Sequence, residues 1–207
     1  MSANRMAILR WIEDLAAVIV TDAEDAADLA TRIAATPNLS AQSFSLEVLS
    51  LTRVVAESVD AASDFDLISS ALQVDGTTLP VLQILQAMAL AIAGVRVDWP
   101  SRPSARRARS RMASSGDIAL SAASALGAGG AETFAWLASL VAVSSRLISD
   151  LAANAAPIVR VQTGVSLPST VLAYQLYGDA NRAEAMIDIA GAATPLVMPT
   201  HFDALAS

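Results

Sequence analysis

Apolar residues recur at helical spacing through the first three quarters of the chain. From Met6 to Ile19 they follow the i, i+3, i+4, i+7 rule of a helix with one buried face. The same periodicity predicts further helices over residues 22–35, one or two within 40–76, and then over 79–94, 102–126 and 131–155. Turn residues at Thr36-Pro37, at Asp75-Gly76 and between Gly127 and Gly130 separate these segments. We therefore predict a helical body over residues 1–157, with an internal boundary near 76–79.

Two of the predicted helix starts have recognisable capping residues. Thr21 stands three residues before Glu24, which is the capping-box spacing, so Thr21 is the predicted N-cap of the second helix. Ser101 is the predicted cap of the helix that carries Pro103 in its first turn.

The pattern changes after Pro157. Residues 158–163 alternate and are rich in β-branched side chains, which predicts a short strand. Two short helices are predicted next, over 168–177 and 181–189, and the segment 195–199, bracketed by prolines, can form at most a short edge strand. The predicted fold class is mainly α: a helical bundle body followed by a small α+β module of strand–helix–helix–strand order over residues 158–207.

Composition limits the classes of protein that the chain can represent. The 207 residues are 54% apolar and carry a net charge of −7, and the absence of Cys excludes disulfide and thiolate-metal scaffolds. The mean hydropathy of +0.50 is inflated by alanine, so we expect neither membrane insertion nor a signal peptide. Small side chains allow close helix packing but give a thin core, which favours an oligomer. Trp11, Trp99 and Trp136 are expected to be core or interface anchors.

Residues suited to catalysis are scarce. The single histidine, His201, stands in a C-terminal tail that we expect to be mobile, without convergent partners. Acidic residues between Asp22 and Asp28 are better explained by the positive N-terminal end of a helix than by a metal site. The glycines near residue 127 lack the context of a phosphate-binding loop. We therefore expect no enzymatic activity, no metal and no cofactor.

All 13 basic residues are arginine, and five of them fall within ten positions. This cluster consists of Arg102, Arg106, Arg107, Arg109 and Arg111. On a helix it forms a broad polar stripe, which suits a surface or inter-subunit face. Binding of nucleic acid phosphates is the alternative interpretation. We favour the first, because the chain is acidic overall and aromatic residues hardly interleave the arginines.

A segment near the C-terminus carries a more specific pattern. It runs Leu-Pro-Ser-Thr-Val-Leu-Ala-Tyr-Gln-Leu-Tyr-Gly-Asp-Ala-Asn-Arg-Ala-Glu over residues 167–184. Its centre is formed by Leu176, Tyr177, Gly178, Asp179 and Arg182. This segment resembles the C-terminal signature of the Mu-type phage DNA circularisation protein family, which comprises tail and baseplate proteins of contractile-tailed phages. The resemblance extends over residues 79–207, and the module is similar to LysM modules.

The resemblance implies a structural component of a contractile phage tail, at the baseplate or as a tail-tube adaptor. It implies assembly in the host cytoplasm, location in the virion, a homo-oligomeric ring, and contacts with other tail and baseplate proteins. Two alternatives stay open: a DNA-binding protein that holds or circularises genome ends through the Arg102–Arg111 cluster, and a peptidoglycan-binding tail module.

The same five signature residues also have a simple structural interpretation. Leu176 and Tyr177 are expected to pack in the module's core, and Gly178 to supply a left-handed C-cap. Asp179 is expected to cap the next helix and to pair with Arg182.

Overall fold

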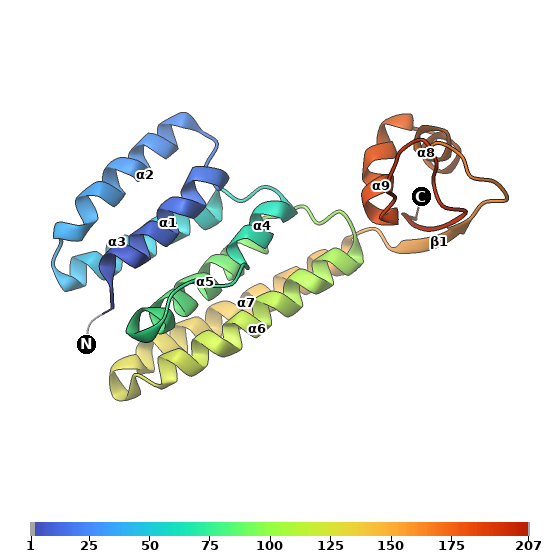
Figure 1. Ribbon diagram of the computed structural model, residues 1–207. Helices are drawn as coiled ribbons and strands as arrows, with labels where there is room; N and C mark the ends of the chain where they lie inside the picture. Colours follow the sequence, from blue (N-terminus) through green and yellow to red (C-terminus); the bar gives the residue numbers. More distant parts are fainter. Residues whose placement is uncertain (1–2, 207) are drawn as a thin grey trace. The chain divides into compact units, whose positions relative to one another are not determined.

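The computed structural model describes residues 3–206 and confirms a mainly helical fold, with a small two-stranded antiparallel sheet and short helices near the C-terminus (Figure 1). The chain divides into two compact units. Among the described residues, the first unit comprises 3–99 and 106–151, and the second comprises 100–105 and 152–206. The two long helices over residues 102–124 and 131–154 therefore have most of their residues in the first unit and a few in the second.

The first unit begins with five helices. They are α1 (Arg5–Ile19), α2 (Ala23–Ala35), α3 (Ala41–Glu57), α4 (Ala62–Ile68) and α5 (Leu79–Ala93), with 3-10 turns at η1 (Thr36–Asn38) and η2 (Gly76–Thr78). Helix α1 packs against α2, α3 and α4, and α3 packs along α5. The second helix is capped by Asp22, whose carboxylate accepts hydrogen bonds from the Glu24 and Asp25 amides. The predicted Thr21 cap is wrong, because helix α2 begins one residue later than expected.

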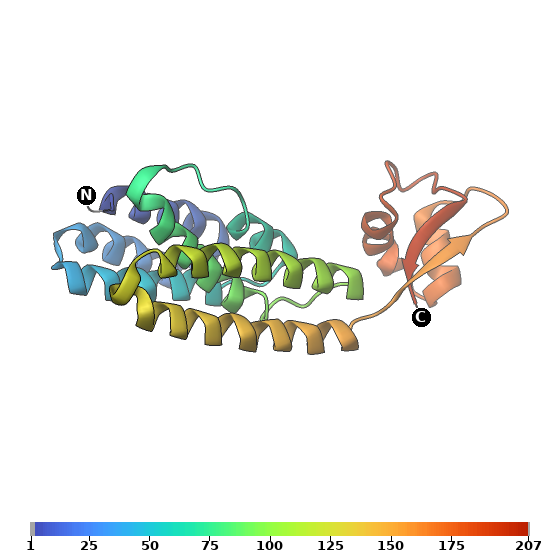
Figure 2. The ribbon, with the colours of Figure 1, turned by 90° about the horizontal axis from the view of Figure 1, so that it is seen from below.

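Two long helices complete this unit and lie side by side (Figures 1 and 2). They are α6 (Arg102–Ser124) and α7 (Ala131–Asn154), joined by the turn η3 (Gly127–Gly130). The buried face of α6 consists largely of alanine, and a Cβ atom added to Gly116 would lie 2.9 Å from Val141 Cγ1. Small residues therefore let the two helices approach closely, as the composition predicted.

The core of the first unit contains one well-ordered aromatic pair. The rings of Phe65 and Trp99 meet edge to face, with 5.3 Å between their centroids. The Trp99 indole N–H donates to the Gly94 carbonyl at 3.0 Å, so its polar atom is satisfied although the side chain is buried. Trp99 is thus a core anchor, as predicted.

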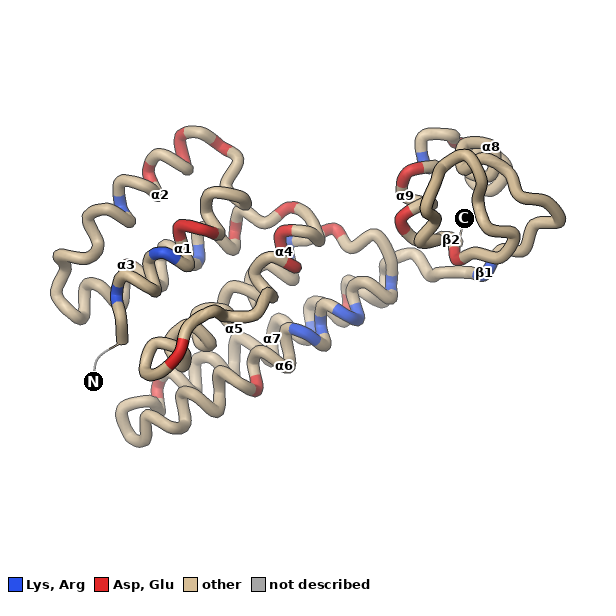
Figure 3. The backbone as a smooth tube through the Cα atoms, in the orientation of Figure 1, with Lys and Arg blue, Asp and Glu red and all other residues tan. Residues whose placement is uncertain are grey.

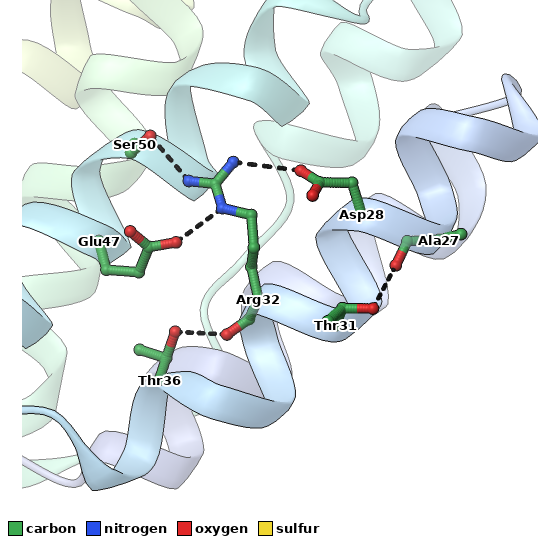
Figure 4. A network of polar contacts seen from close by, with 7 residues as sticks. All are labelled: Ala27, Asp28, Thr31, Arg32, Thr36, Glu47 and Ser50. Carbon is green, nitrogen blue, oxygen red and sulfur yellow. Dashed lines mark hydrogen bonds and ion pairs between the residues drawn. The ribbon is translucent and has the colours of Figure 1, made fainter.

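A polar network joins α2 to α3 (Figure 4). The Arg32 guanidinium donates to Glu47 at 2.7 Å and to Ser50 at 2.9 Å, and it pairs with Asp28 at 3.5 Å. The hydrogen bond with Glu47, aided by the negative charge of both carboxylates, raises the pKa of Arg32 above its ordinary value despite partial burial. Arg32 therefore stays charged and holds the two helices together.

The second unit contains the α+β module. Its elements are β1 (Ile158–Gln162), α8 (Ser169–Tyr177), η4 (Ala180–Arg182), α9 (Ala183–Ala190) and β2 (His201–Leu205). The strands are antiparallel, with Ile158 opposite Leu205 and Gln162 opposite His201. The helices pack on the sheet around a small core that includes Leu172, Met186 and Phe202.

The strand–helix–helix–strand order is confirmed, but the position of the second strand differs from the prediction. Residues 195–199 form no strand, and the strand follows at residues 201–205. The segment 195–199 is held by individual hydrogen bonds instead of a strand ladder. One of them is donated by the Met198 amide to the Leu167 carbonyl at 3.1 Å. His201 begins this strand, and the expectation that it stands in a mobile tail is therefore wrong.

Candidate functional site

The signature residues form the connection between α8 and α9. Leu176 and Tyr177 are half-buried against the core of the module. Gly178 ends α8 in the left-handed conformation, with φ of 70° and ψ of 8°. Because glycine adopts this conformation without a steric penalty, the chain turns sharply toward α9. The structural predictions for these three residues are confirmed.

Asp179 and Arg182 have separate partners. The Asp179 carboxylate accepts a hydrogen bond from the Asn181 amide at 2.9 Å and caps η4, as expected of a capping aspartate. The Arg182 guanidinium instead lies over the Tyr177 ring, 4.8 Å from its centroid. Among residues 3–206 no ion pair joins Arg182 to Asp179, so the predicted pairing is wrong.

Tyr177 is the residue on which these contacts converge. Its hydroxyl donates to the Leu205 carbonyl of β2 at 3.2 Å, while its ring contacts the module's core and carries Arg182 on one face. The signature is therefore built into the fold of the module rather than exposed as a separate loop.

Three arginines of the α6 cluster are engaged within the protein. Arg111 pairs with Asp66 of α4, and Arg109 donates to Ser149 Oγ of α7 at 3.0 Å. Arg102 donates to the Ala153 carbonyl in the last turn of α7 at 3.1 Å, where a cation suits the negative end of the helix.

The remaining two arginines of the cluster, Arg106 and Arg107, are exposed. Within the described part of the chain neither makes a hydrogen bond or an ion pair. Three arginines of the cluster thus fix α6 to neighbouring segments of the protein. Arg106 and Arg107 remain exposed to solvent, where they are available to another molecule.

Helix α7 exposes a row of large apolar side chains beside its buried face. Leu137, Ser144 and Ile148 face the core, and Leu137 meets α5 and α6 there. The neighbouring row, here named the α7 stripe, consists of Trp136 (45% exposed), Val143 (55%), Leu147 (45%) and Leu151 (38%), with half-buried Leu140 among them. The spacing of 4, 3, 4 and 4 residues places all five on one side of the helix.

Two segments within residues 3–206 have the length and apolar composition to cross a membrane. Half of Gly76–Ala93 is buried inside the protein, whereas only 17% of the most apolar 18-residue stretch within Gly127–Asn154 is buried. The α7 stripe accounts for much of this exposed apolar surface, which is the kind of patch that marks an interaction site.

A wide groove of about 1630 Å³ runs along α1. Its walls come from α2 and from the segment between Leu67 and Val74, and its lining is largely apolar, including Trp11, Leu15 and Ile33. Glu13 and Asp14 line the same groove, so an apolar surface and two carboxylates are combined. We name it the α1–α2 groove.

The described residues contain no group of three or more His, Asp or Glu side chains that could hold a metal ion. The chain has no Cys.

No family model matches the chain, and the search of curated proteins finds no match either.

Neither the stripe nor the groove was predicted. The stripe has a signal in the sequence, because the heptad-like spacing of Trp136, Leu140, Val143 and Leu147 is visible there. The row lies next to a second apolar row that contains Leu137 and Ile148. Periodicity alone does not show which of the two rows is buried against the rest of the protein. The groove has no comparable signal, since segments far apart in the sequence form it.

Proposed function

We propose that the chain is a structural, non-enzymatic component of a contractile phage tail, at the baseplate or as a tail-tube adaptor. It acts by ring assembly and by contacts with other tail proteins. The protein is assembled in the host cytoplasm and resides in the virion.

The observation that carries the proposal is the signature itself. The residues from Leu176 to Arg182 resemble the family's C-terminal motif, and they lie in a module of strand–helix–helix–strand order. In this module Gly178 ends α8 in the left-handed conformation and the Tyr177 hydroxyl donates to the last strand, so both motif residues have structural roles.

The first unit supports an assembly role independently of the signature. Its α7 stripe exposes large apolar groups in one row, and the largest apolar patch of a protein is often an interaction site. Contacts of α7 with another protein surface would remove these side chains from water.

The two alternatives have less support. Three of the five α6 arginines are engaged within the protein, which leaves Arg106 and Arg107 for nucleic acid phosphates. No observation on the module points to a glycan in particular. DNA binding predicts a steep loss of affinity with salt, and peptidoglycan binding predicts retention in a pull-down.

The test is the composition of purified particles. Mass spectrometry of particles from the phage that encodes this chain should detect the protein at a fixed multiple copy number, and immunogold labelling should place it on the tail. Particles that lack the protein would contradict the proposal.

A further inference from the structure

We propose that Asp75 is a site of spontaneous backbone modification, at which the bond from Asp75 to Gly76 rearranges to an isoaspartyl linkage through a cyclic succinimide. Nowhere else in the sequence is an Asp or an Asn followed by Gly. The inference is independent of the proposed function, because it concerns the chemistry of one peptide bond and its surroundings in the first unit.

The rearrangement needs no enzyme, metal or oxidant. The backbone nitrogen of Gly76 attacks the side-chain carbon Cγ of Asp75 when the carboxyl group is protonated. A bond forms between this nitrogen and Cγ, and the carboxyl hydroxyl leaves with the amide proton as water. Water then opens the ring at either carbonyl. Opening at Cγ restores aspartate, and opening at the main-chain carbonyl leaves the chain running through Cβ and Cγ, so one water is lost and one is regained.

Gly76 leaves the attacking nitrogen accessible. A side chain on the residue after an aspartate shields the amide nitrogen, and glycine has none. A Cβ atom built at Gly76 would meet nothing within 4 Å, so the surrounding protein does not crowd the bond. The Gly76 amide stands at the first position of η2, where a helix leaves its amides without an intrahelical acceptor, and within residues 3–206 it donates to no other group.

The carboxyl group of Asp75 is not held by a partner. The residue is exposed, and among the residues that the structure describes its side chain makes no capping hydrogen bond and joins no ion pair. Residues 54–95 contain no arginine or lysine, and the backbone from α4 to α5 carries only acidic positions (Figure 3). Nothing along this segment therefore restrains the carboxyl group electrostatically.

The backbone around the bond can rotate into the geometry of attack. The Asp75 ψ angle of 175° is that of extended backbone, and ring closure requires it to rotate. Residues 71–75 belong to no helix or strand and run as a coil outside the helices (Figure 2). Gly76, with φ of 66°, absorbs the compensating change, because glycine adopts either sign of φ without a steric penalty. Local opening of the three-residue turn η2 is therefore sufficient.

Asp60 is the internal control within the same unit. Like Asp75 it is exposed and lies outside the helices, but the next residue is Ala61. The Ala61 amide donates to a carboxylate oxygen of Asp64 at 3.3 Å, so the nitrogen that would attack Asp60 is engaged. We therefore expect rearrangement at Asp75 and not at Asp60.

The modified bond lies beside a surface already described. The preceding segment, from Leu67 to Val74, forms one wall of the α1–α2 groove. Thr78, three residues after Asp75, accepts a hydrogen bond from the Asn4 amide at 2.9 Å. The rearrangement inserts one methylene into the main chain between these two fixed points.

The experiment uses the folded full chain, kept for weeks at neutral pH in water enriched in oxygen-18. Each cycle of ring closure and opening places one solvent oxygen in residue 75, so the peptide that contains it becomes heavier. Endoproteinase Asp-N, which cuts before aspartate but not before isoaspartate, measures the rearranged fraction as loss of cleavage after Val74. Labelling at Asp75 should exceed that at Asp60 at least about tenfold, because only Asp75 is followed by glycine.

Two variants test the roles of the two residues. Gly76→Asn shields the nitrogen while asparagine still tolerates positive φ, so labelling of residue 75 should fall at least about tenfold with an unchanged far-UV circular dichroism spectrum. Asp75→Asn should close the ring faster than wild type, with ammonia as the leaving group, because an amide is not ionised at neutral pH.

Three results would overturn the proposal. They are labelling of Asp75 no faster than that of Asp60, labelling that Gly76→Asn leaves unchanged, and rearrangement that occurs only after the chain is unfolded in urea. None of them bears on the proposed function, which is tested on purified particles. Equally, absence of the protein from particles would leave the rearrangement at Asp75 standing.

Discussion

The guanidinium carbon of Arg182 lies 4.8 Å from the centre of the Tyr177 ring, while the Tyr177 hydroxyl donates to the Leu205 carbonyl at the other end of the side chain. One aromatic residue thus joins α8, the start of α9 and the last strand. The contacts of Tyr177 and Arg182 therefore fix the connection between α8 and α9 to the rest of the module.

Replacing Tyr177 by Phe should destabilise the C-terminal module by about 1 kcal/mol, because the Leu205 carbonyl loses its hydrogen-bond donor. Amide hydrogen exchange in β2 is the suitable measurement, since it reports on the module alone. Tyr174→Phe is the matched control, because Tyr174 is exposed and its hydroxyl has no such contact. Equal exchange rates in the two variants would contradict the role given to Tyr177.

The contact between Arg182 and Tyr177 should appear as a coupling free energy. A double-mutant cycle with Arg182→Gln and Tyr177→Leu is expected to give about 0.5 kcal/mol, the usual size of an exposed cation–π contact. The parallel cycle of Arg182→Gln with Asp179→Asn should give none, because Asp179 accepts from a backbone amide instead. A larger coupling in the second cycle would restore the ion pair that the sequence suggested.

Gly130 should not tolerate a side chain. A Cβ atom there would lie 2.1 Å from the Ala123 carbonyl oxygen, so Gly130→Ala must displace the backbone between α6 and α7. We expect a loss of about 1–3 kcal/mol, as in other overpacked sites, measured by guanidinium unfolding of the first unit through tryptophan fluorescence. Gly129→Ala is the control, because nothing lies within 4 Å of its Cβ position. Equal losses of unfolding free energy in the two variants would contradict the prediction, because the clash at residue 130 would then have no cost of its own.

Arg32→Ala should cost about 1–2 kcal/mol, because a half-buried, charge-assisted network between α2 and α3 is removed. Arg53→Ala removes only an exposed pair with Glu57 at 3.9 Å and should have no measurable effect.

The pH dependence follows from the raised pKa of Arg32. Stability from a raised pKa is fully present below the unfolded-state pKa of arginine and is lost as the pH rises through the higher folded-state pKa, and both lie well above pH 10. The titration of Arg32 itself should therefore contribute no change in stability between pH 6 and 10. Unfolding curves of wild type and Arg32→Ala across that range test this, and a difference between them that falls steadily toward pH 10 would contradict it.

Local sequence rules predicted most of the elements. The helices of the body, the strand at 158–162, the Ser101 cap and the Gly178 turn all depend on residues within a few positions of one another. The same rules failed at Thr21, where two adjacent residues can both cap a helix and Asp22 does so. They also failed at residues 195–205, because a strand is defined by its partner, and β1 lies about 40 positions away.

The sequence by itself determined the helical body, the order of elements in the C-terminal module, the left-handed turn at Gly178 and the packing of Tyr177 in the module's core, since each follows from backbone preferences or from the spacing of apolar residues. Only the tertiary structure decided which side of α7 stays uncovered, which arginines of α6 are engaged, and that Arg182 lies on Tyr177 rather than beside Asp179. The reason is that periodicity specifies which residues share a face of a helix. Which of these faces is buried depends on segments that meet only when the chain has folded. The same holds for the partner that a long charged side chain reaches.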